Sequence, residues 1–340
     1  MKANFYIRML LVFIIIPLML SCDSKLDMPP VYNNSFLFFD QSNDTLKLLC
    51  GGIESVVEGK APEFPSEVWQ FKNGQWSYVS GSCGGPKNIR GAAFDSNSSH
   101  IYCLSLSEPI SVWCWNGKNW VSLQKGLPLD TDKNSIIVYS IKRNRIELYD
   151  FFNQRLLFLN KDIWQIDNKH NVLSLPECHG IGISYTSHSY YNSYSDRLYI
   201  YNPLPEYGFC SDIFDLVVIS EGKQNIIGYF PENISNIEAV TLDKSKNRII
   251  FFAYDDSQKE FSIYEFLENE FVEKPSINSP SGRMHACFIY SLRHNGIVMY
   301  GGYGDSDGLF GLGPASVPCP ETWLIKYSEK ESSYIWEQLD

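Results

Sequence analysis

Apolar and polar positions along the chain follow a short pattern that occurs six times. Each copy starts with an aromatic residue or Leu, here called the opener, and continues through a polar turn. The openers are Phe39, Phe94, Tyr139, Tyr191, Leu242 and Tyr290. Apolar residues stand seven positions later, at Leu46, Ile101, Ile146, Leu198, Ile249 and Ile297, and nine positions later, at Leu48, Cys103, Leu148, Ile200, Phe251 and Met299. Alternation with a period of two predicts strands, so each copy predicts two strands joined by a turn.

A second hairpin follows in each copy, most clearly where two Trp stand seven residues apart around an Asn-Gly turn. Trp69 and Trp76 flank one such turn, and Trp113 and Trp120 flank another. Two hairpins make a four-stranded sheet, and openers 45 to 55 residues apart have the period of a propeller blade. A single sheet of this size cannot bury both of its faces, whereas a ring of stacked sheets can. Strands account for the whole repeat in this interpretation, so we expect almost no helix.

The fold class predicted from this pattern is all-β: a six-bladed β-propeller with four-stranded antiparallel blades. The propeller would span residues 35–340, with blades at approximately 35–80, 88–124, 134–167, 181–230, 235–274 and 282–340. The chain enters on a first strand and leaves on a fourth, so we expect no blade built from both termini. Ring closure would then depend on packing of blade one against blade six, which residues 29–34 could reinforce.

The N-terminal 21 residues have the features of an export signal. Lys2 and Arg8 precede an apolar run at 9–16, and the run is too short for a comfortable membrane span. The segment Met19-Leu20-Ser21-Cys22 resembles a bacterial lipobox, which implies lipidation of Cys22 and a tether over residues 22–34. The alternative is ordinary secretion. The sequence thus predicts a bacterial envelope protein, periplasmic or at the cell surface, that contacts the membrane through its N-terminal lipid.

Composition limits the kinds of partner and cofactor that we expect for this protein. The formal net charge is -11, which argues against nucleic acid because its binding needs clustered Lys and Arg. Export permits disulfides, and Cys178 with Cys210 is the pair we consider. Cys103, Cys114 and Cys287 fall in predicted strands, where a thiol behaves as a small apolar residue. The chain has no CxxC spacing, and we predict neither a metal site nor a cofactor.

The sixth copy resembles a kelch repeat. Its residues 281–285 carry Arg283 and His285, Gly301-Gly302 ends the next strand, and spaced aromatics follow at 321–327 and 334–336. The first copy keeps Gly51-Gly52 with its two Trp, while the middle copies lack the double Gly. The resemblance implies that binding surfaces are built from loops between second and third strands and between blades. It also implies that Arg and His in these positions commonly tie strands and loops together.

The longest of these loops indicate where a ligand would bind. They are 51–67 in blade one, 202–212 in blade four and 301–321 in blade six, and ring closure would bring the first and last side by side. Arg283 and His285 offer a cation and a proton-transfer group. The candidate ligand-binding residues are Arg283, His285, Tyr303, Asp305, Asp307 and Phe310. We expect the two Asp in a solvated Gly-rich turn rather than around Ca²⁺, because the fragment shows too few oxygen ligands.

Three functions compete. The first is a non-catalytic protein that binds a glycan or a protein at the envelope, since no convincing nucleophile, base pair or metal cluster occurs. The second is an enzyme similar to exported kelch sialic acid mutarotases, also called N-acetylneuraminate epimerases, for which Arg283 and His285 could supply part of the chemistry. The third is an assembly scaffold without a small ligand. We favour the first, with no catalytic residue assigned.

Overall fold

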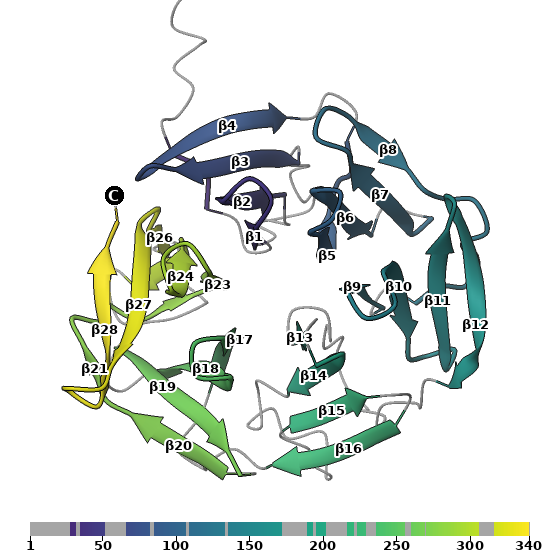
Figure 1. Ribbon diagram of the computed structural model, residues 1–340. Helices are drawn as coiled ribbons and strands as arrows, with labels where there is room; N and C mark the ends of the chain where they lie inside the picture. The colour runs from purple at the N-terminus through teal and green to yellow at the C-terminus, as the bar shows by residue number, and fades with distance from the viewer. Residues whose placement is uncertain are drawn as a thin grey trace, which may run out of the picture.

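A computed structural model confirms the predicted class: six four-stranded antiparallel sheets stand around a central axis as the blades of a propeller (Figure 1). The structure describes residues 28–31, 35–51, 66–81, 85–106, 109–132, 135–171, 189–192, 195–201, 216–220, 223–228, 236–255, 260–268, 270–305 and 316–339. The predicted signal peptide, Cys22, Cys178 and Cys210 lie outside these residues. Within them no helix is long and apolar enough to cross a membrane.

The strands follow the repeat, blade by blade from the axis outward. Blade one holds β1 (Phe36–Asp40), β2 (Thr45–Cys50), β3 (Glu67–Lys72) and β4 (Gln75–Gly81); blade two holds β5 (Ile89–Asp95), β6 (His100–Ser105), β7 (Ser111–Trp115) and β8 (Trp120–Ser122). Blade three holds β9 (Ile136–Ser140), β10 (Arg145–Asp150), β11 (Arg155–Asn160) and β12 (Ile163–Asn171); blade four holds β13 (Ser189–Asn192), β14 (Arg197–Tyr201), β15 (Leu216–Ser220) and β16 (Lys223–Gly228). Blade five holds β17 (Asn236–Asp243), β18 (Arg248–Asp255), β19 (Glu260–Leu267) and β20 (Glu270–Lys274).

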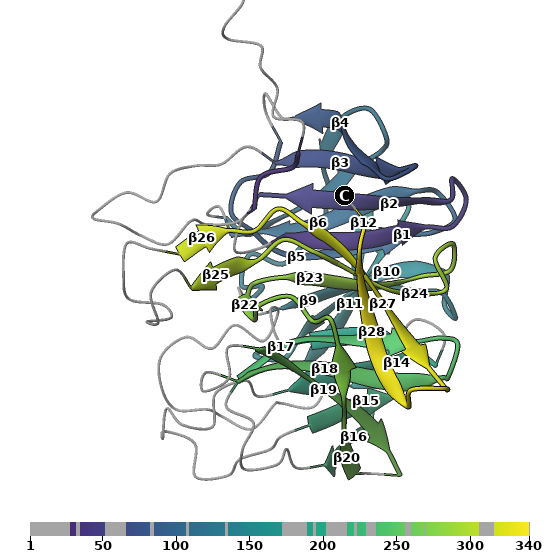
Figure 2. The ribbon, with the colours of Figure 1, turned by 90° about the vertical axis from the view of Figure 1, so that its left-hand side faces the viewer.

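Blade six is larger than the others. Its four main strands are β23 (Cys287–Ser291), β24 (Gly296–Tyr300), β27 (Thr322–Ser328) and β28 (Ser333–Gln338). A short strand of the preceding connection, β21 (Ser276–Ile277), pairs in parallel with the outer edge of β28. A separate three-stranded ribbon is formed by β22 (Arg283–Met284), β25 (Tyr303–Asp305) and β26 (Ser316–Pro318). The ribbon projects beyond the blade on the side of the long connections (Figure 2).

The turn after each opener has the same construction in all six blades. The residue after the opener accepts a hydrogen bond from a backbone N–H two or three positions later; these residues are Asp40, Asp95, Ser140, Asn192, Asp243 and Ser291. The fifth residue after the opener has a positive φ, between 47° and 57°; these residues are Asp44, Ser99, Asn144, Asp196, Asn247 and Asn295. Asn and Asp tolerate this backbone well and cap turns with their side chains. The polar part of the repeat therefore encodes the turn.

The apolar part of the repeat fills six buried clusters, one at each junction between neighbouring blades. Openers and the residues seven and nine positions later take part in them; for example, Leu148 is fully buried between blades two and three, and Phe251 between blades four and five. Burial of such side chains contributes about 1.5–3 kcal/mol each. Every sheet covers the face of its neighbour, as the ring requires.

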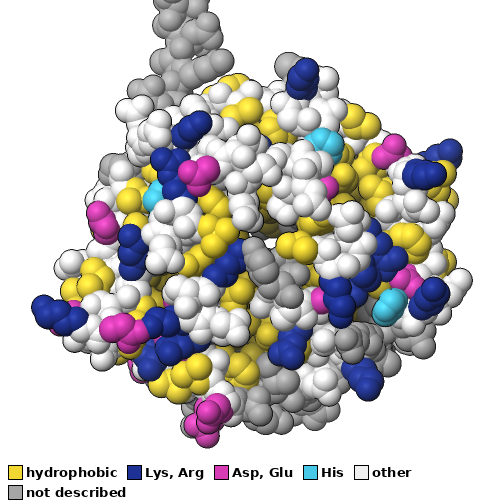
Figure 3. Space-filling model, viewed as in Figure 1, with side chains coloured by type: hydrophobic (Ala, Val, Ile, Leu, Met, Phe, Trp, Pro, Cys, Tyr) yellow, Lys and Arg dark blue, Asp and Glu magenta, His cyan; other side chains and the backbone are white. Residues whose placement is uncertain are grey.

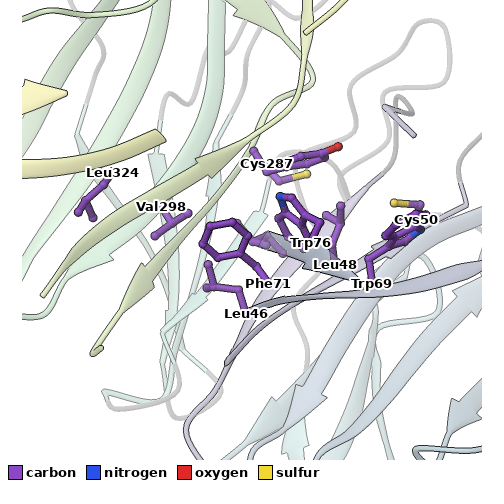
Figure 4. Close-up of a cluster of buried hydrophobic side chains, with 11 residues drawn as sticks. Leu46, Leu48, Cys50, Trp69, Phe71, Trp76, Cys287, Val298 and Leu324 are labelled. Carbon is purple, nitrogen blue, oxygen red and sulfur yellow. The ribbon is translucent and has the colours of Figure 1, made fainter. Parts of the chain in front are cut away.

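Blades one and six close the ring by side-chain packing, as the sequence predicted. Trp76 of blade one lies beside Leu48, Phe71 and Cys287 at this junction (Figure 4). Its indole Nε1 donates to Thr322 Oγ1 of blade six at 2.9 Å, and its ring packs edge-on against Tyr300 at a centroid distance of 4.8 Å. Trp76 is thus wedged between blades one and six.

Residues 28–31 lie against the same junction and bind both blades. Tyr300 Oη donates to Pro29 O at 2.5 Å, and Tyr303 Oη donates to Val31 O at 2.6 Å. On the other side, Cys50 Sγ of blade one lies 3.5 Å from Pro30 O. The part of the predicted tether that the structure describes therefore reinforces the junction of blades one and six, here called the seam. This agrees with the expectation from the sequence for residues 29–34.

The propeller has two different faces. The turns after the openers and the turns between third and fourth strands share one face, here called the turn face. The connections between second and third strands and between blades share the other, here called the loop face. Figure 2 shows the turn face on the right and the loop face on the left, and Figure 3 shows Lys and Arg side chains around the turn face.

Side chains connect neighbouring blades across the turn face. Ser42 Oγ donates to Ser96 O at 3.1 Å between blades one and two, and Asn97 Nδ2 donates to Tyr139 Oη at 2.7 Å between blades two and three. Further links join blade three to four through Arg143 and Asp196, five to six through Lys246 and Glu329, and six to one through Arg293 and Asp44 O. Among the described residues, such links therefore join five of the six pairs of neighbouring blades.

Candidate binding face

The loop face carries the connections that differ most among the blades. Long connections follow β2, β12, β14 and β24, whereas β10 and β11 are joined by the short turn 151–154. The residues 52–65, 202–215 and 306–315 of the three predicted binding loops lie outside the described part of the chain. What the structure describes is where these loops start and end, together with the complete loop-face turn of blade three.

The blade-six loop begins as a ribbon rather than as the Gly-rich turn expected from the sequence. Tyr303–Asp305 form β25, which pairs with β22 and with β26. The reason is visible at the double glycine: Gly301 and Gly302 have φ values of 74° and 99°, which redirect the chain after β24. The expectation of an irregular loop was therefore wrong for residues 303–305.

Arg283 is part of the scaffold of this ribbon. It is 2% exposed, and its Nη1 lies 2.7 Å from Glu321 Oε2. Its Nε donates to Ser281 O at 3.3 Å. The stem of the side chain lies on Gly302, where a Cβ atom would stand 2.8 Å from Arg283 Cγ. The guanidinium thus has an internal partner and ties the two ends of the blade-six loop together.

His285 lies close by and is exposed, with a φ of 61°. Its backbone N–H donates to Glu238 Oε2 of blade five at 3.0 Å. Although much of the residue surface is accessible, the protein atoms surrounding the imidazole lower the pKa of His285 by desolvation. The ring is therefore biased toward its neutral form, which can both donate and accept a hydrogen bond.

The remaining predicted residues separate into two groups. Tyr303 is opposite Met284 in the ribbon, so the structure brings it beside Arg283 and His285, and its hydroxyl is bonded to Val31 O. Asp305 ends β25, where it pairs with Ser316 through the backbone. Asp307 and Phe310 lie outside the described residues. Among the residues that are described, no group of three or more His, Cys, Asp or Glu side chains is placed to hold a metal ion.

An exposed apolar pair on blade three was missed by sequence reasoning. Phe152 is 80% exposed at the tip of the turn between β10 and β11, and Leu129, in the preceding connection, is 92% exposed. The two segments are joined because Asn153 Nδ2 donates to Asp130 O at 2.8 Å. A second link is the ion pair of Arg155 with Asp130, at 2.8 Å. The available signal was an aromatic residue inside a polar turn, Phe152-Asn153-Gln154.

The turn that presents Phe152 is well braced. Asp150 is fully buried and accepts from Asn153 N–H at 3.2 Å, while Gln154 N–H donates to Phe151 O at 3.3 Å. Arg155 Nε also donates to Asp150 Oδ2 at 2.8 Å. Phe152 is thus displayed to solvent by a turn whose polar groups are paired, which is how a preorganised contact residue is held.

Comparison with known proteins supports the fold. No protein-family model matches the chain, and no curated protein matches it. The SapL1 lectin, solved in complex with α-methyl fucoside, is 11% identical with a TM-score of 0.50, and the match covers 91% of this chain and 96% of the lectin. An auxiliary nutrient-binding protein from Bacteroides thetaiotaomicron is 8% identical with a TM-score of 0.48, covering 79% and 67% of the two chains. The WD40 β-propeller domain of Doa1 is 7% identical with a TM-score of 0.45, covering 90% and 83%.

Proposed function

We propose that this protein is a non-catalytic glycan-binding propeller that recognises its ligand with the loop face. The observation that carries the proposal is the contrast between the faces. The turn face repeats one capped turn six times, whereas the loop face gathers connections of unequal length and displays Phe152 and Leu129. Binding residues are commonly held on such loops by a rigid scaffold.

The surroundings of Phe152 suit a sugar. An aromatic ring offers an apolar surface for the C–H face of a pyranose, and the adjacent Asn153, Asp130 and Arg155 offer hydrogen-bonding groups. Among the large apolar side chains that the structure describes, Leu129 and Phe152 are the two most exposed. The lectin that shares the propeller fold was solved with a fucoside, which agrees with a sugar ligand without identifying one for this chain.

We further propose that lipidation of Cys22 holds the propeller at the bacterial envelope. The support is the sequence of residues 1–22, with its basic start, apolar run and lipobox. Labelling of expressing cells with an alkyne fatty acid should mark the full chain and should fail to mark Cys22→Ala. Labelling of both proteins alike, or of neither, would refute the lipid anchor and leave the binding proposal intact.

The binding proposal is tested by a glycan array followed by calorimetry on the full chain purified in detergent. We expect a defined set of glycans to bind, and Phe152→Ala to weaken the best binder by about tenfold or more, which is about 1.4 kcal/mol. The matched control is Leu292→Ala, because Leu292 is 41% exposed on the turn face of blade six. Failure of every glycan to bind would refute the proposal, as would equal losses in the two variants.

The sialic acid mutarotase alternative remains a prediction from the kelch resemblance. The cation it would need, Arg283, is bonded to Glu321.

A further inference from the structure

Two of the innermost strands carry a β-bulge at the same position of the repeat. In β5 of blade two the ladder with β6 skips Arg90, and in β17 of blade five the ladder with β18 skips Glu238. Each residue stands four positions before its opener, at the loop-face end of the strand closest to the axis. Blades two and five lie opposite each other in the ring (Figure 1). Bulges of this kind redirect a side chain and are frequent beside functional sites.

The two bulge residues differ in whether a polar atom of the side chain is left buried without a hydrogen-bond partner. Glu238 accepts a hydrogen bond from His285 N–H. Arg90 is half-buried, and its Nε is buried without a hydrogen-bond partner. Within the described chain the other arginines that are not fully solvated lie beside carboxylates: Arg143, Arg145, Arg155, Arg248, Arg283 and Arg293. Arg90 has no such neighbour among the residues that the structure describes.

An uncompensated guanidinium at this depth is unfavourable for the folded state. Burial lowers the pKa of Arg90, and no carboxylate opposes this effect. For Arg143 burial acts in the same direction, but Glu147 and Asp196 outweigh it and raise the pKa. An arginine stays charged even so, because its pKa remains far above neutrality. The chain has 39 acidic residues against 28 basic ones, and none of the acidic side chains in the described segments pairs with this cation.

A second unpaired polar group lies in the adjoining blade. Ser135 also stands four positions before its opener, directly before β9, and β5 packs against β9. It is fully buried, and its hydroxyl has no hydrogen-bond partner. Buried polar groups are normally satisfied. The loop-face end of the junction between blades two and three therefore holds two unsatisfied polar side chains, Arg90 and Ser135, next to the blade that presents Phe152.

We propose that Arg90 is an anion-recognition residue of the loop face and binds the carboxylate of an acidic sugar. The inference rests on the proposed glycan-binding function and specifies its ligand class. The planar guanidinium donates two parallel N–H bonds to a carboxylate, a geometry that a neutral sugar cannot offer. A bound carboxylate would supply the negative charge that no described residue places beside Arg90. Arg90 would then act as a specificity group of the loop face.

The test starts from an array that contains glucuronate-, galacturonate- and sialate-bearing glycans, sulfated glycans and their neutral counterparts. We expect carboxylated glycans to be selected, the methyl ester of the best binder to bind at least tenfold more weakly, and Arg90→Gln to weaken the free acid at least tenfold. Arg90→Gln should leave the affinity for the methyl ester unchanged. The control Arg197→Gln removes an exposed arginine on the turn-face side of blade four and should change neither affinity.

The outcomes distinguish this inference from the proposed function. Selection of neutral or sulfated glycans alone would overturn the carboxylate assignment and leave the binding function standing, whereas an empty array would refute both. Arg90→Gln is also expected to melt no lower than the parent protein, because it removes a cation without a partner. A lower melting temperature together with unchanged affinity for the acid would show that Arg90 is structural and would overturn the inference.

Discussion

The turn face and the loop face are built from the same six repeats but follow different rules. On the turn face, corresponding positions of the six repeats have the same role. An Asp, Asn or Ser caps each turn, and a residue with positive φ ends it. On the loop face the position four before the opener is less uniform: three copies have Ser, and the others have Arg90, Glu238 and Ala286. The repeat thus specifies the scaffold on one face and leaves the other free to vary, which is the arrangement expected of a binding protein.

The difference also concerns energetics. Buried charges near the turn face are satisfied by several partners: Asp196 accepts from Arg143 Nη1 at 2.6 Å, from Arg143 Nη2 at 2.9 Å and from Tyr191 Oη at 2.5 Å. Unsatisfied buried hydroxyls occur near both faces, at Thr45 and Ser333 on the turn face and at Ser135 on the loop face, whereas the unsatisfied charged side chain among the described residues, Arg90, lies on the loop face. Satisfied networks stabilise, while unsatisfied groups cost free energy unless a ligand completes them. On our proposal, a ligand bound at the loop face would complete the unsatisfied guanidinium of Arg90.

The largest expected effect is on the turn-face network. Asp196→Asn should lower the free energy of unfolding by about 3 kcal/mol, because the change removes the charge of a buried carboxylate and leaves the half-buried Arg143 with one carboxylate fewer. The matched control is Asp44→Asn, at the same turn position of blade one, where the side chain is 61% exposed and the change should cost at most about 0.5 kcal/mol. Urea unfolding measures both. Equal costs would show that the network between blades three and four adds nothing to the turn itself.

A smaller difference is expected between two glycines with similar backbone. Gly302 at the base of the loop face has a φ of 99° and Gly117 on the turn face a φ of 91°. A Cβ at Gly302 would meet Arg283 Cγ at 2.8 Å, whereas nothing lies within 4 Å at Gly117. Alanine should therefore cost about 1 kcal/mol at Gly117 from backbone strain alone, and about 2 kcal/mol more at Gly302 from overpacking. If the two variants unfolded at similar temperatures, the contact of Arg283 with Gly302 would not support the blade-six loop.

The smallest effect is a pH dependence. Burial alone would raise the pKa of Asp167, but bonds from Arg145, the backbone N–H of Lys169 and His170 lower it to about 2. Because the pKa of the folded state lies below the ordinary 3.8, the charged carboxylate stabilises the fold at higher pH, and this contribution disappears as the pH falls from about 4 toward 2.

The comparison of parent and Asp167→Asn measures this contribution. The parent should be more stable by about 1 kcal/mol at neutral pH, and the two unfolding free energies should converge by about pH 2. Asp130→Asn, which alters the exposed ion pair with Arg155 on the loop face, should show a smaller difference at neutral pH. A constant gap between parent and Asp167→Asn down to pH 2 would contradict the assignment of the stabilisation to the ionised carboxylate.

Much of the fold could be predicted because its determinants are local. The alternation after each opener sets which side chains enter the clusters between blades, and the polar residues after the opener cap the turn by themselves. The ring followed from the repeat, since each sheet needs a neighbour on both faces. The seam at Trp76 was also predictable in outline, although its bond to Thr322 joins residues 246 positions apart and has no local signal.

The candidate site was less predictable because its determinants are not local. Arg283 was a candidate ligand-binding residue, although the kelch resemblance implied that such an Arg ties strands and loops together; its partner Glu321 had no local signal, because it is reached only where the double glycine lets the side chain lie against the backbone. Tyr303 reads as a contact residue, but the segment at 28–31 takes up its hydroxyl. Arg90 gave no signal, because a bulge is a property of the register between two strands and not of either strand alone.

The seam between the first and last blades has a consequence for how the chain could be rearranged. Blades one and six are held together there by side chains such as Trp76, and residues 28–31 contact both blades. No strand is exchanged between the described ends of the polypeptide, so this junction, like the other five, is closed by packing between blades. A circular permutant that starts at another inter-blade connection should therefore still assemble, provided that a new linker restores the path from Leu339 to Pro29.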